Sequence, residues 1–349
     1  MRFRRVCGDG AGLGVRMKRD QAGDIPWQPC ATRAVLRRRA ALLDQIRSFF
    51  RARDVLEVDT PVLSAAGTPS PVLESFRALY RGPGVSQART LYLHTSPEFA
   101  MKRLLAAGSG SIYQICKVFR NGEAGRLHNP EFTLLEWYRV GFDDSQLMDE
   151  VESFMRHMIP QAHQPAEYHR VAYRELFQRY ADVDGLAATA VDLQDCLRSR
   201  RIGCPAGLAA TDLDGWRDLV LSEVIAPQLV DDVVFVYDYP ASQAALARLR
   251  PGVPAVAQRF ELYWRGLELA NGFCELTSAT EQSRRFALER QQRRERKLPD
   301  VALDARFLAA LRAGLPDCSG VAVGVDRLLM VAAGKDDIRD VLAFPFDRA

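Results

Sequence analysis

Long apolar runs, paired cysteine motifs and an excess of one charge are all missing from this sequence. No uninterrupted apolar stretch approaches the roughly 20 residues of a membrane helix, and the opening segment MRFRRVCGDGAGLGVRMKRD lacks the apolar centre of a signal peptide. The formal net charge is only +3 over 349 residues, so the molecule as a whole has no general attraction for nucleic acid. We therefore expect a soluble, cytoplasmic protein with no membrane partner.

The seven cysteines are odd in number and include no Cys-x-x-Cys pair. This pattern argues against a disulfide framework and against a thiolate zinc site, so reduced thiols are the simpler expectation. With 48% hydrophobic residues, the chain can bury a sizeable core. Its length allows one large domain or two smaller ones, and we favour one.

Residues 1–28 are rich in Gly and Arg and have no periodicity, which predicts a disordered tail. Translation from Met17 and a basic docking arm are the alternatives for this segment. We expect one folded domain over residues 29–349. Within it, residues 165–232 mix helical pieces with Asp- and Gly-bearing loops, and we interpret them as a helical insertion.

Helical spacing of apolar residues predicts amphipathic helices over 32–53 and 145–158, and a polar helix rich in Arg and Glu over 280–297. Strands are predicted over 55–63 (interrupted at Pro61), 91–93, 233–240 and 259–273, and residues 320–334 pass from strand to helix.

The segment SPEFAMKRLLAAG predicts a further helix, with Ser96 as its cap, Pro97 at its first position and Gly108 beyond its end. Glu98 and Lys102 lie four residues apart on this helix. That spacing is typical of an ion pair on a helix surface, and we interpret it so.

The segment FRNGEAGRLHNPEFTLLEWY, residues 119–138, combines charges and aromatics in a way that neither a surface loop nor a core strand pair explains. Strand-like residues flank a polar loop that begins at Asn121-Gly122. The pattern predicts an antiparallel hairpin over 111–140 whose loop and strand end carry a site.

Several motifs resemble the catalytic core of class II aminoacyl-tRNA synthetases, closest to the lysyl branch. They are Phe119-Arg120 followed by HNPEFTLLEWY, the segment ELANGFCEL, and GVAVGVDR ending in Arg327. Pro61 matches the proline of the family's first motif, at the edge where its members form homodimers. The resemblance implies an α+β fold with an antiparallel sheet flanked by helices.

The chain has only its short tail where a bacterial lysyl-tRNA synthetase carries an anticodon-binding OB domain. Together with DCSGVAVGVDR and the terminal AFPFDRA, this is similar to the free-standing paralogues that attach (R)-β-lysine to a lysine of translation elongation factor P. The resemblance implies an ATP-dependent ligase that uses ATP and Mg²⁺ and has elongation factor P and β-lysine as substrates. Binding of tRNA is not expected.

The resemblance also implies residue roles. Arg120 would hold the α-phosphate and the incoming carboxylate, and Arg327 the γ-phosphate, because fixed cations offset the charge that develops on phosphoryl oxygens. The positions implied at the nucleotide are Arg120, Asn121, Gly122, Glu123, His128, Asn129, Phe132 (stacked on adenine), Glu268, Leu269, Gly324 and Arg327. Glu261 and Glu268 would hold the metal, and Arg120, Arg327 and Glu268 are the implied catalytic residues.

A substrate with two ammonium groups needs several carboxylates, since a desolvated cation left unpaired is costly. The positions implied at the amino acid are Ser96, Pro97, Glu98, Glu136, Tyr138, Glu275 and Ala322. Glu261, Glu268 and Glu275 lie seven apart, and seven is odd. The turn at Arg265-Gly266 or the Gly272 break must therefore reset the strand phase if all three converge.

Two positions depart from the family pattern. Gly122 stands where the family has a glutamate that contacts adenine, so either Glu123 reaches the base through a reshaped loop or ATP discrimination is weaker. Ala322 replaces the middle glycine of the third motif. Our hypothesis is that its methyl group favours an amino group on the β-carbon, and an unchanged preference in Ala322→Gly would refute it. No general base for the transfer is evident.

Two other functions stay open at this point. One is a compact synthetase that charges tRNA without an anticodon domain, and the other is a regulatory module that binds ATP or an amino acid without catalysis. Pyrophosphate exchange separates the regulator from the enzymes, and the identity of the acceptor separates the two enzymes.

Overall fold

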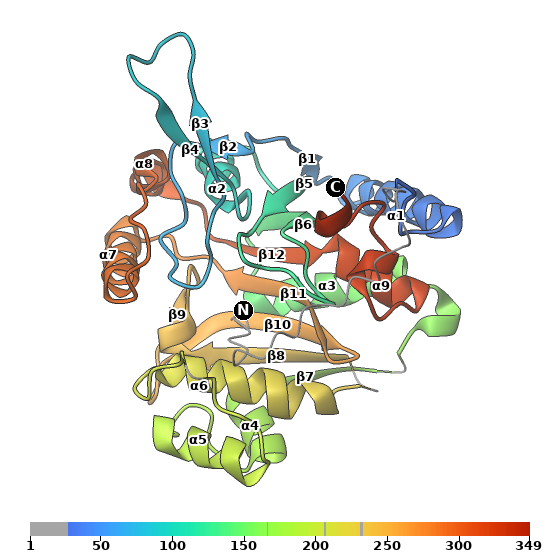
Figure 1. Cartoon of the computed structure of the whole chain (residues 1–349), viewed down its shortest axis with the longest axis vertical. Helices are drawn as coiled ribbons and strands as arrows, with labels where there is room; N and C mark the ends of the chain where they lie inside the picture. The colour runs from blue at the N-terminus through green and yellow to red at the C-terminus, as the bar shows by residue number, and fades with distance from the viewer. Residues whose placement is uncertain (1–26, 166, 206, 231–232) are drawn as a thin grey trace, which may run out of the picture.

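A nine-stranded mixed sheet organises the chain (Figure 1). The computed structural model describes residues 27–165, 167–205, 207–230 and 233–349. The tail expected over residues 1–28 therefore lies almost entirely outside the described residues. The strands follow one another across the sheet in the order β1 (Leu56–Glu57), β5 (Ile112–Phe119), β6 (Glu131–Val140), β12 (Cys318–Gly324), β11 (Leu267–Cys274), β10 (Val256–Trp264), β8 (Val233–Pro240) and β7 (Tyr168–Ala172), and β9 (Leu249–Arg250) pairs with β10.

The strands pair antiparallel except at the two edges, where β1 runs parallel to β5 and β7 parallel to β8. The predicted hairpin over 111–140 is confirmed, with β5 and β6 in register from Ile112 opposite Tyr138 to Phe119 opposite Glu131. Because side chains alternate between faces along a strand, β6 presents Leu135 and Trp137 to one side and Glu136 and Tyr138 to the other. The α+β prediction is confirmed.

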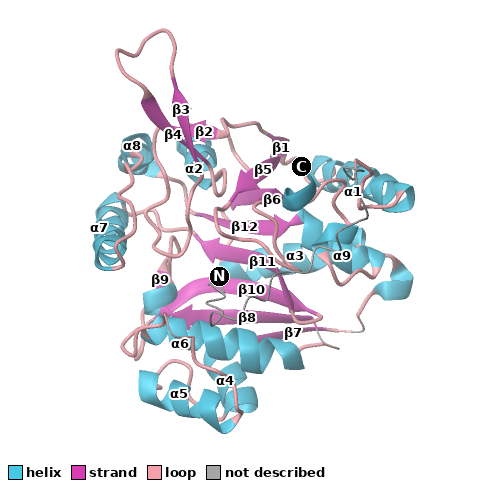
Figure 2. Cartoon of the chain, in the orientation of Figure 1, coloured by secondary structure: helices cyan, strands magenta, loops and turns pink. Residues whose placement is uncertain are grey.

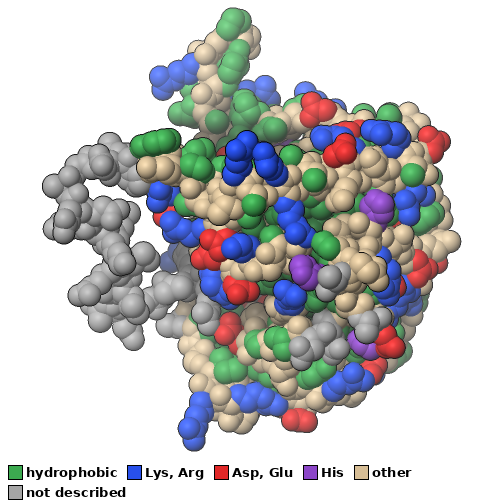
Figure 3. All heavy atoms as spheres, turned by 90° about the vertical axis from the view of Figure 1, so that its right-hand side faces the viewer, with side chains coloured by type: hydrophobic (Ala, Val, Ile, Leu, Met, Phe, Trp, Pro, Cys, Tyr) green, Lys and Arg blue, Asp and Glu red, His purple; other side chains and the backbone are tan. Residues whose placement is uncertain are grey.

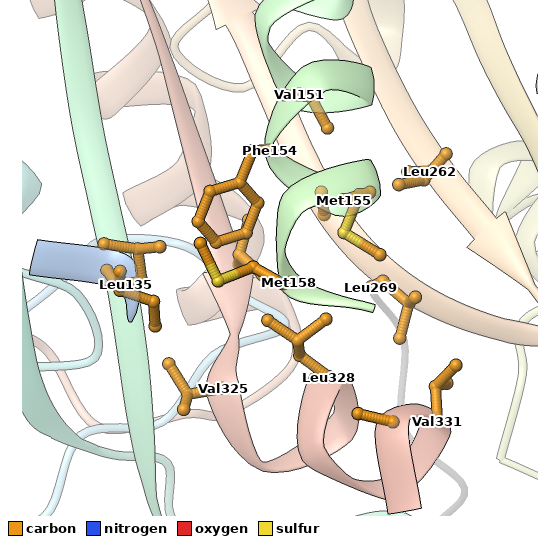
Figure 4. Close-up of a cluster of buried hydrophobic side chains, with 14 of the residues drawn as sticks. Leu135, Val151, Phe154, Met155, Met158, Leu262, Leu269, Val325, Leu328 and Val331 are labelled. Carbon is orange, nitrogen blue, oxygen red and sulfur yellow. The ribbon is translucent and has the colours of Figure 1, made fainter. Parts of the chain in front are cut away.

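Helices α1 (Arg33–Arg51), α3 (Asp144–Met158) and α9 (Val325–Ala333) cover one face of the sheet. Figure 2 shows this layer of helices beside the strands. Their apolar stripes meet the inward side chains of the central strands in the largest buried cluster. Figure 4 shows part of it, with Phe154 and Met158 of α3, Leu328 of α9 and Leu135 of β6 packed together. This dry layer fixes the strands whose opposite face carries polar side chains.

The opposite side is built from shorter elements. Helices α2 (Glu98–Ala106), α7 (Ala279–Glu295) and α8 (Ala305–Gly314) pack together around a smaller apolar cluster. A small sheet of β2 (Leu63–Ser64), β4 (Arg89–Leu93) and β3 (Arg77–Tyr80) projects from the body in Figure 1. Helices α4 (Tyr173–Ala181), α5 (Ala190–Ser199) and α6 (Leu213–Val220) pack beyond β7 and β8.

The stretch 259–273 is two strands joined by the turn expected at Arg265 and Gly266, both with positive φ. Other predicted elements differ from the observed ones. Residues 165–232 contain helices as expected, and also strand β7, which extends the main sheet. The strand expected over 55–63 is reduced to two-residue pieces. Strand β3 was not predicted, and neither was helix α8, although Asp304 caps it and Phe307, Leu308 and Leu311 follow helical spacing.

The surface agrees with the nearly neutral composition. On the face in Figure 3, Lys and Arg side chains are interspersed with Asp and Glu. In the part of the chain that the structure describes, no helix combines the length and apolar character needed to cross a bilayer.

Candidate active site

A cavity of about 1190 Å³ lies over the face of the sheet that the helices α1, α3 and α9 leave open. It is lined by side chains from β6, β11 and β12, by the loop between β5 and β6, and by α2 and α7. The alternation of each strand decides which residues reach it: Glu136 and Tyr138 line the cavity, whereas the intervening Trp137 is buried against α3.

Most of the predicted site residues come together in this cavity. Those that line it are Ser96, Pro97, Glu98, Arg120, Glu123, His128, Asn129, Phe132, Glu136, Tyr138, Glu268, Leu269, Glu275, Ala322, Gly324 and Arg327. Asn121, Gly122 and Glu261 are not among the lining residues.

Two arginines form a cationic end of the cavity. The guanidinium of Arg327 donates to the backbone oxygen of Glu268 at 2.8 Å and contacts Nε2 of His128 at 2.6 Å. Arg120 donates to the backbone oxygen of Thr95 at 3.5 Å, and its guanidinium lies 5.0 Å from the centre of the Phe132 ring. Backbone oxygens thus help to hold both guanidinium groups in the cavity, and the carboxylates of Glu123 and Glu268 lie 3.9 and 4.0 Å from Arg120 and Arg327. Two guanidinium groups at one end of a cavity are suited to an anion.

His128 is neutral between these arginines. Burial and the charges of Arg327 and Arg120 lower the pKa of His128 to about 3. A neutral imidazole accepts the hydrogen bond from Arg327 and adds no further positive charge. The neighbouring Asn129 bonds instead to backbone, donating to the oxygen of Glu131 at 2.5 Å and accepting from the nitrogen of Phe346 at 2.9 Å.

Glu123 reaches into the cationic end although Gly122 does not. Gly122 has a φ of +84°, a turn conformation that suits glycine, with nothing within 4 Å of a Cβ built there. Glu123 is 3% exposed, and its Oε1 has no hydrogen-bond partner in the described residues. Burial raises the pKa of Glu123 to about 7, against the lowering effect of Arg120 and Arg327.

Carboxylates form the other end of the cavity. Glu136 on β6 accepts from the hydroxyl of Ser96 at 2.7 Å and from that of Tyr138 at 2.6 Å. Burial and the negative charge of Glu98 raise the pKa of Glu136 to about 7. Burial likewise raises the pKa of Glu275, to about 8. Carboxyl groups that are costly to ionise alone become favourable partners for a cation.

The ion pair between Glu98 and Lys102 is buried, so its interpretation as a surface pair is wrong. Lys102 is 1% exposed, and its Nζ lies 2.5 Å from Oε1 of Glu98 and 2.6 Å from Oε2 of Glu275. The sequence contained a signal for this position. Glu98, Met101, Lys102 and Leu105 follow the i, i+3, i+4, i+7 spacing of a single helix face.

The helix start itself is close to the prediction. Pro97 occupies the cap position and α2 begins at Glu98, one residue later than expected. The hydroxyl of Ser96 still accepts from the nitrogen of Glu98 at 3.0 Å, and Gly108 lies beyond the last turn with a φ of +85°.

The three spaced glutamates end in different surroundings. Glu261 is enclosed by protein: the hydroxyls of Tyr239 and Tyr263 donate to it at 2.8 and 2.7 Å, and Arg259 pairs with it. Burial opposes its charge, but Arg259 holds the pKa of Glu261 below its usual range. In the described residues, the carboxylate of Glu268 has one ion-pair partner, Arg327 at 4.0 Å.

The strand phase is reset by the turn together with a β-bulge. Across the hairpin, Glu261 lies opposite Asn271, but Tyr263 lies opposite Glu268, which leaves Leu269 as an extra residue on β11. Opposed residues share a face, so Glu261 and Glu268 lie on the same side of the sheet. The bulge was not predicted.

Strand β12 lines the carboxylate end with small residues. A Cβ built on Gly320 would lie 2.3 Å from the Tyr138 ring and 2.6 Å from Oε1 of Glu275, so glycine is required there. Ala322 lies opposite Glu136 in the β12–β6 pairing and lines the cavity.

A supporting residue that the sequence did not reveal is Asp326. It is 1% exposed, accepts from Arg39 at 2.6 Å and from the backbone nitrogen of Thr133 at 2.7 Å, and immediately precedes Arg327. It therefore ties α1, β6 and the start of α9 together behind the cationic end. In the described residues, no cluster of three or more His, Cys, Asp or Glu side chains is arranged to hold a metal.

Comparison with known proteins identifies close relatives. The family model described as tRNA synthetases class II (D, K and N) matches residues 27–348. A protein of Vibrio atlanticus named elongation factor P--(R)-beta-lysine ligase is 47% identical over 329 residues, 93% of this chain and 99% of that protein. Proteins of the same name from Salmonella arizonae and Vibrio cholerae are 45% and 46% identical, each over 93% of this chain and 98% of their own length. The resemblance predicted from the motifs is confirmed.

Proposed function

Since this chain belongs to the family of tRNA synthetases class II (D, K and N), we propose that it is an ATP-dependent ligase that activates (R)-β-lysine and transfers it to a lysine of translation elongation factor P. The observation that carries the proposal is a single cavity with two arginines at one end and three carboxylates at the other. Such a cavity suits the simultaneous binding of a polyanion and a diamino acid. The names of the relatives support the choice of acceptor.

In the first step, a carboxylate oxygen of β-lysine attacks the α-phosphorus of ATP, and the bond to the bridging oxygen of pyrophosphate breaks. The products are the aminoacyl adenylate and pyrophosphate. Two anions must approach each other, so fixed cations supply the main stabilisation. Arg120 would contact the α-phosphate and the incoming carboxylate, and Arg327 the γ-phosphate.

In the second step, the ε-amine of the acceptor lysine attacks the carbonyl carbon of the anhydride and AMP leaves. The attacking amine must lose a proton, and desolvation in the complex lowers the pKa of such an amine. The anhydride is already activated, so no covalent intermediate with the enzyme is needed.

At the carboxylate end, the two ammonium groups of the substrate would pair with Glu98, Glu136 and Glu275. Burial raises the pKa values of Glu136 and Glu275, which supports this role, because a bound ammonium group favours their ionised form. Ala322 would contact the substrate near the carbon that carries its amino group.

At the cationic end, Gly122 stands at the position of the family's adenine-contacting glutamate. Glu123 would make that contact instead. Its unpartnered, buried Oε1 in the cavity supports this assignment. In Glu123→Gln the KM for ATP should rise about three- to tenfold, because the adenine amino group loses a charged acceptor. Pyrophosphate exchange at varied ATP concentration measures this, and an unchanged KM would leave Glu123 without that role.

Magnesium is implied by the family, and the donor set fits it through Glu268. Glu268 lines the cavity with a side chain that is 15% exposed, whereas the oxygens of Glu261 are occupied by Arg259 and two tyrosines. Magnesium commonly uses one or two carboxylates together with phosphate oxygens. When bound it would offset phosphate charge, and Glu261 would support the strand behind it.

We further propose that residues 29–349 act as one catalytic domain in a cytoplasmic homodimer. Leu56 is exposed on β1, which contacts α1, and the family pairs its subunits at its first motif, which supports this interface. Sedimentation of the purified chain measures the oligomeric state, and a monomer at micromolar concentration would contradict the proposal.

The test of the proposed function uses purified elongation factor P as acceptor. The chain is incubated with ATP, (R)-β-lysine and the factor, and the intact mass of the factor is measured, with total tRNA as a parallel acceptor. We expect the factor to gain one β-lysyl group and tRNA to gain none. Charging of tRNA without modification of the factor would instead identify a minimal synthetase.

A further inference from the structure

Lys102 is a buried cation directly behind the carboxylate end of the cavity. It is 1% exposed and is not among the lining residues, although Glu98 and Arg103 on the same helix are. Lysine is scarce in this chain, which has five lysines among 47 basic residues. A buried lysine is rare unless its ammonium group is paired, so this position asks for a specific explanation.

The contacts of Lys102 engage both neighbouring glutamates through one oxygen each. Its Nζ reaches Oε1 of Glu98 at 2.5 Å and Oε2 of Glu275 at 2.6 Å. The other oxygen of Glu275 lies toward Gly320, where even a Cβ would come within 2.6 Å of it. Gly320 lines the cavity, so Lys102 holds Glu275 from behind while its Oε1 stays on the ligand side.

The charge of Lys102 gives this arrangement its consequence. Glu98, Glu136 and Glu275 outnumber Lys102, so the carboxylate end keeps an excess of negative charge when these groups are ionised. That excess favours a ligand with two ammonium groups over a ligand with one. A buried charge without a partner is costly, so a ligand with one ammonium group would leave a carboxylate uncompensated.

We propose that Lys102 is a positioning residue, a resident ammonium that orients Glu98 and Glu275 toward a diamino ligand. The inference deepens the proposed function and rests on it for the identity of the ligand. Lys102 contacts no substrate itself. It acts through the two carboxylates that do.

The charged and titratable groups that face Lys102 come from several elements. They are Glu98 on its own helix, Glu275 after β11, Glu136 on β6 and Cys318 on β12. Burial opposes the ammonium form, but Glu275 and Glu98 raise the pKa of Lys102 above its usual value, so it stays charged. Lys102 in turn works against the burial that raises the pKa of Glu275. Its removal would therefore leave Glu275 protonated to higher pH.

The principal test compares Lys102→Met with Lys117→Met. Lys117 is an exposed lysine whose side chain pairs with Glu131 at 3.4 Å, and it does not line the cavity. In pyrophosphate exchange, Lys102→Met should raise the KM for the diamino acid about tenfold or more and change kcat by less than about threefold. The KM for the diamino acid depends on pH through the ionisation of Glu275. The midpoint of this dependence should lie about one pH unit higher in Lys102→Met than in wild type. Lys117→Met should behave as wild type.

Two further variants and measurements guard against a purely structural effect. Lys102→Arg keeps the charge and should recover part of the lost affinity, which a packing defect would not predict. Should Lys102→Met fail to fold, wild-type protein labelled at the lysine ε-carbons gives only a few signals. The Lys102 signal should not titrate below pH 10 and should shift when 1,5-diaminopentane is added.

The diamine also separates this inference from the proposed function, because its binding needs no reaction. Calorimetry should show 1,5-diaminopentane binding about tenfold tighter than pentylamine to wild type, and Lys102→Met should bind the diamine about tenfold more weakly than wild type, because Glu98 and Glu275 are no longer held in place. If that holds while no amino acid supports exchange, the proposed function fails and the role of Lys102 stands. A folded Lys102→Met with wild-type KM, pH profile and diamine affinity would overturn the inference.

Discussion

The two ends of the cavity hold opposite charges, and they stabilise them by different means. At the cationic end, backbone oxygens of Glu268 and Thr95 accept hydrogen bonds from Arg327 and Arg120. At the carboxylate end, the side chain of Lys102 pairs with those of Glu98 and Glu275 and offsets part of their charge. The comparison teaches that the two arginines of one end are permanently charged, whereas the charge of the carboxyl groups at the other end depends on pH and on the ligand.

The largest effect is expected where the charge is permanent. Arg327→Ala should lower kcat/KM for pyrophosphate exchange about 100- to 1000-fold, because a fixed cation at developing phosphoryl charge is lost. Exchange at saturating amino acid and varied ATP measures this. Arg179→Ala is the matched control, since Arg179 forms an exposed pair with Glu175 on α4. Exchange within threefold of wild type in Arg327→Ala would remove the cationic end from the mechanism.

The next largest effect is expected at the carboxylate end. Glu275→Gln keeps the shape of the carboxylate end but removes one of its charges. We expect the KM for the diamino acid to rise about 10- to 100-fold, because a buried ammonium loses its charged partner. The KM for ATP should stay within about twofold. A parallel rise in both constants would show that the two ends do not act separately.

A methyl group should have a smaller effect on which amino acid is preferred. Ala322 lines the carboxylate end opposite Glu136, and Ala322→Gly should shift the preference from (R)-β-lysine toward α-lysine by about tenfold. The ratio of kcat/KM for the two amino acids in exchange measures this. An unaltered ratio would exclude Ala322 as the selecting residue.

The smallest effect is expected from a change of pH, which alters the affinity for the diamino acid without any mutation. Burial raises the pKa values of Glu136 and Glu275 to about 7 and 8, so below these values the carboxyls hold protons that a diammonium ligand must displace. Affinity for the diamino acid should therefore rise several-fold, up to about tenfold, from pH 6 to 8.5. At the cationic end His128, with a pKa of about 3, should not titrate in this range, so a change in the affinity for ATP would report on Glu123, whose pKa burial raises to about 7.

The same raised pKa values determine how the stability of the ligand-free protein changes with pH. The folded pKa values of these carboxyls lie above that of a free glutamate, so the stability they contribute is present at low pH. It is lost as pH rises through about 7 to 8. The unfolding temperature of the ligand-free protein should fall across this range, and saturating diamino acid should reverse the fall. A ligand-free unfolding temperature that rises from pH 6 to 8.5 would contradict the raised pKa values.

The sequence predicted those parts of the molecule that repeat a pattern. The β5–β6 hairpin, the amphipathic helices and the strand-to-helix passage at Gly324 have periodicities that packing preserves. The bulge at Leu269 could not be predicted, because it depends on how β10 and β11 pair. Strand β3 projects from the body and buries little, so its residues show no alternation.

For the site, the motifs brought the correct side chains to one cavity, but the sequence did not distinguish exposure from burial. Glu98 and Lys102 have the spacing of a surface pair, and only the packing of α2 against α8 encloses them. Glu261 illustrates the converse. Its spacing matches that of Glu268, yet Tyr239 and Arg259 enclose it. Partners distant in the sequence decide both cases.

The most direct test of the two-ended cavity is ATP–pyrophosphate exchange by the wild-type chain with three amino acids that differ in their ammonium groups. These are (R)-β-lysine, α-lysine and norleucine, which lacks the second amine. We predict exchange with the two diamino acids, fastest with (R)-β-lysine, and none above background with norleucine. Exchange with norleucine at a comparable rate, or no exchange with any of the three, would contradict the account.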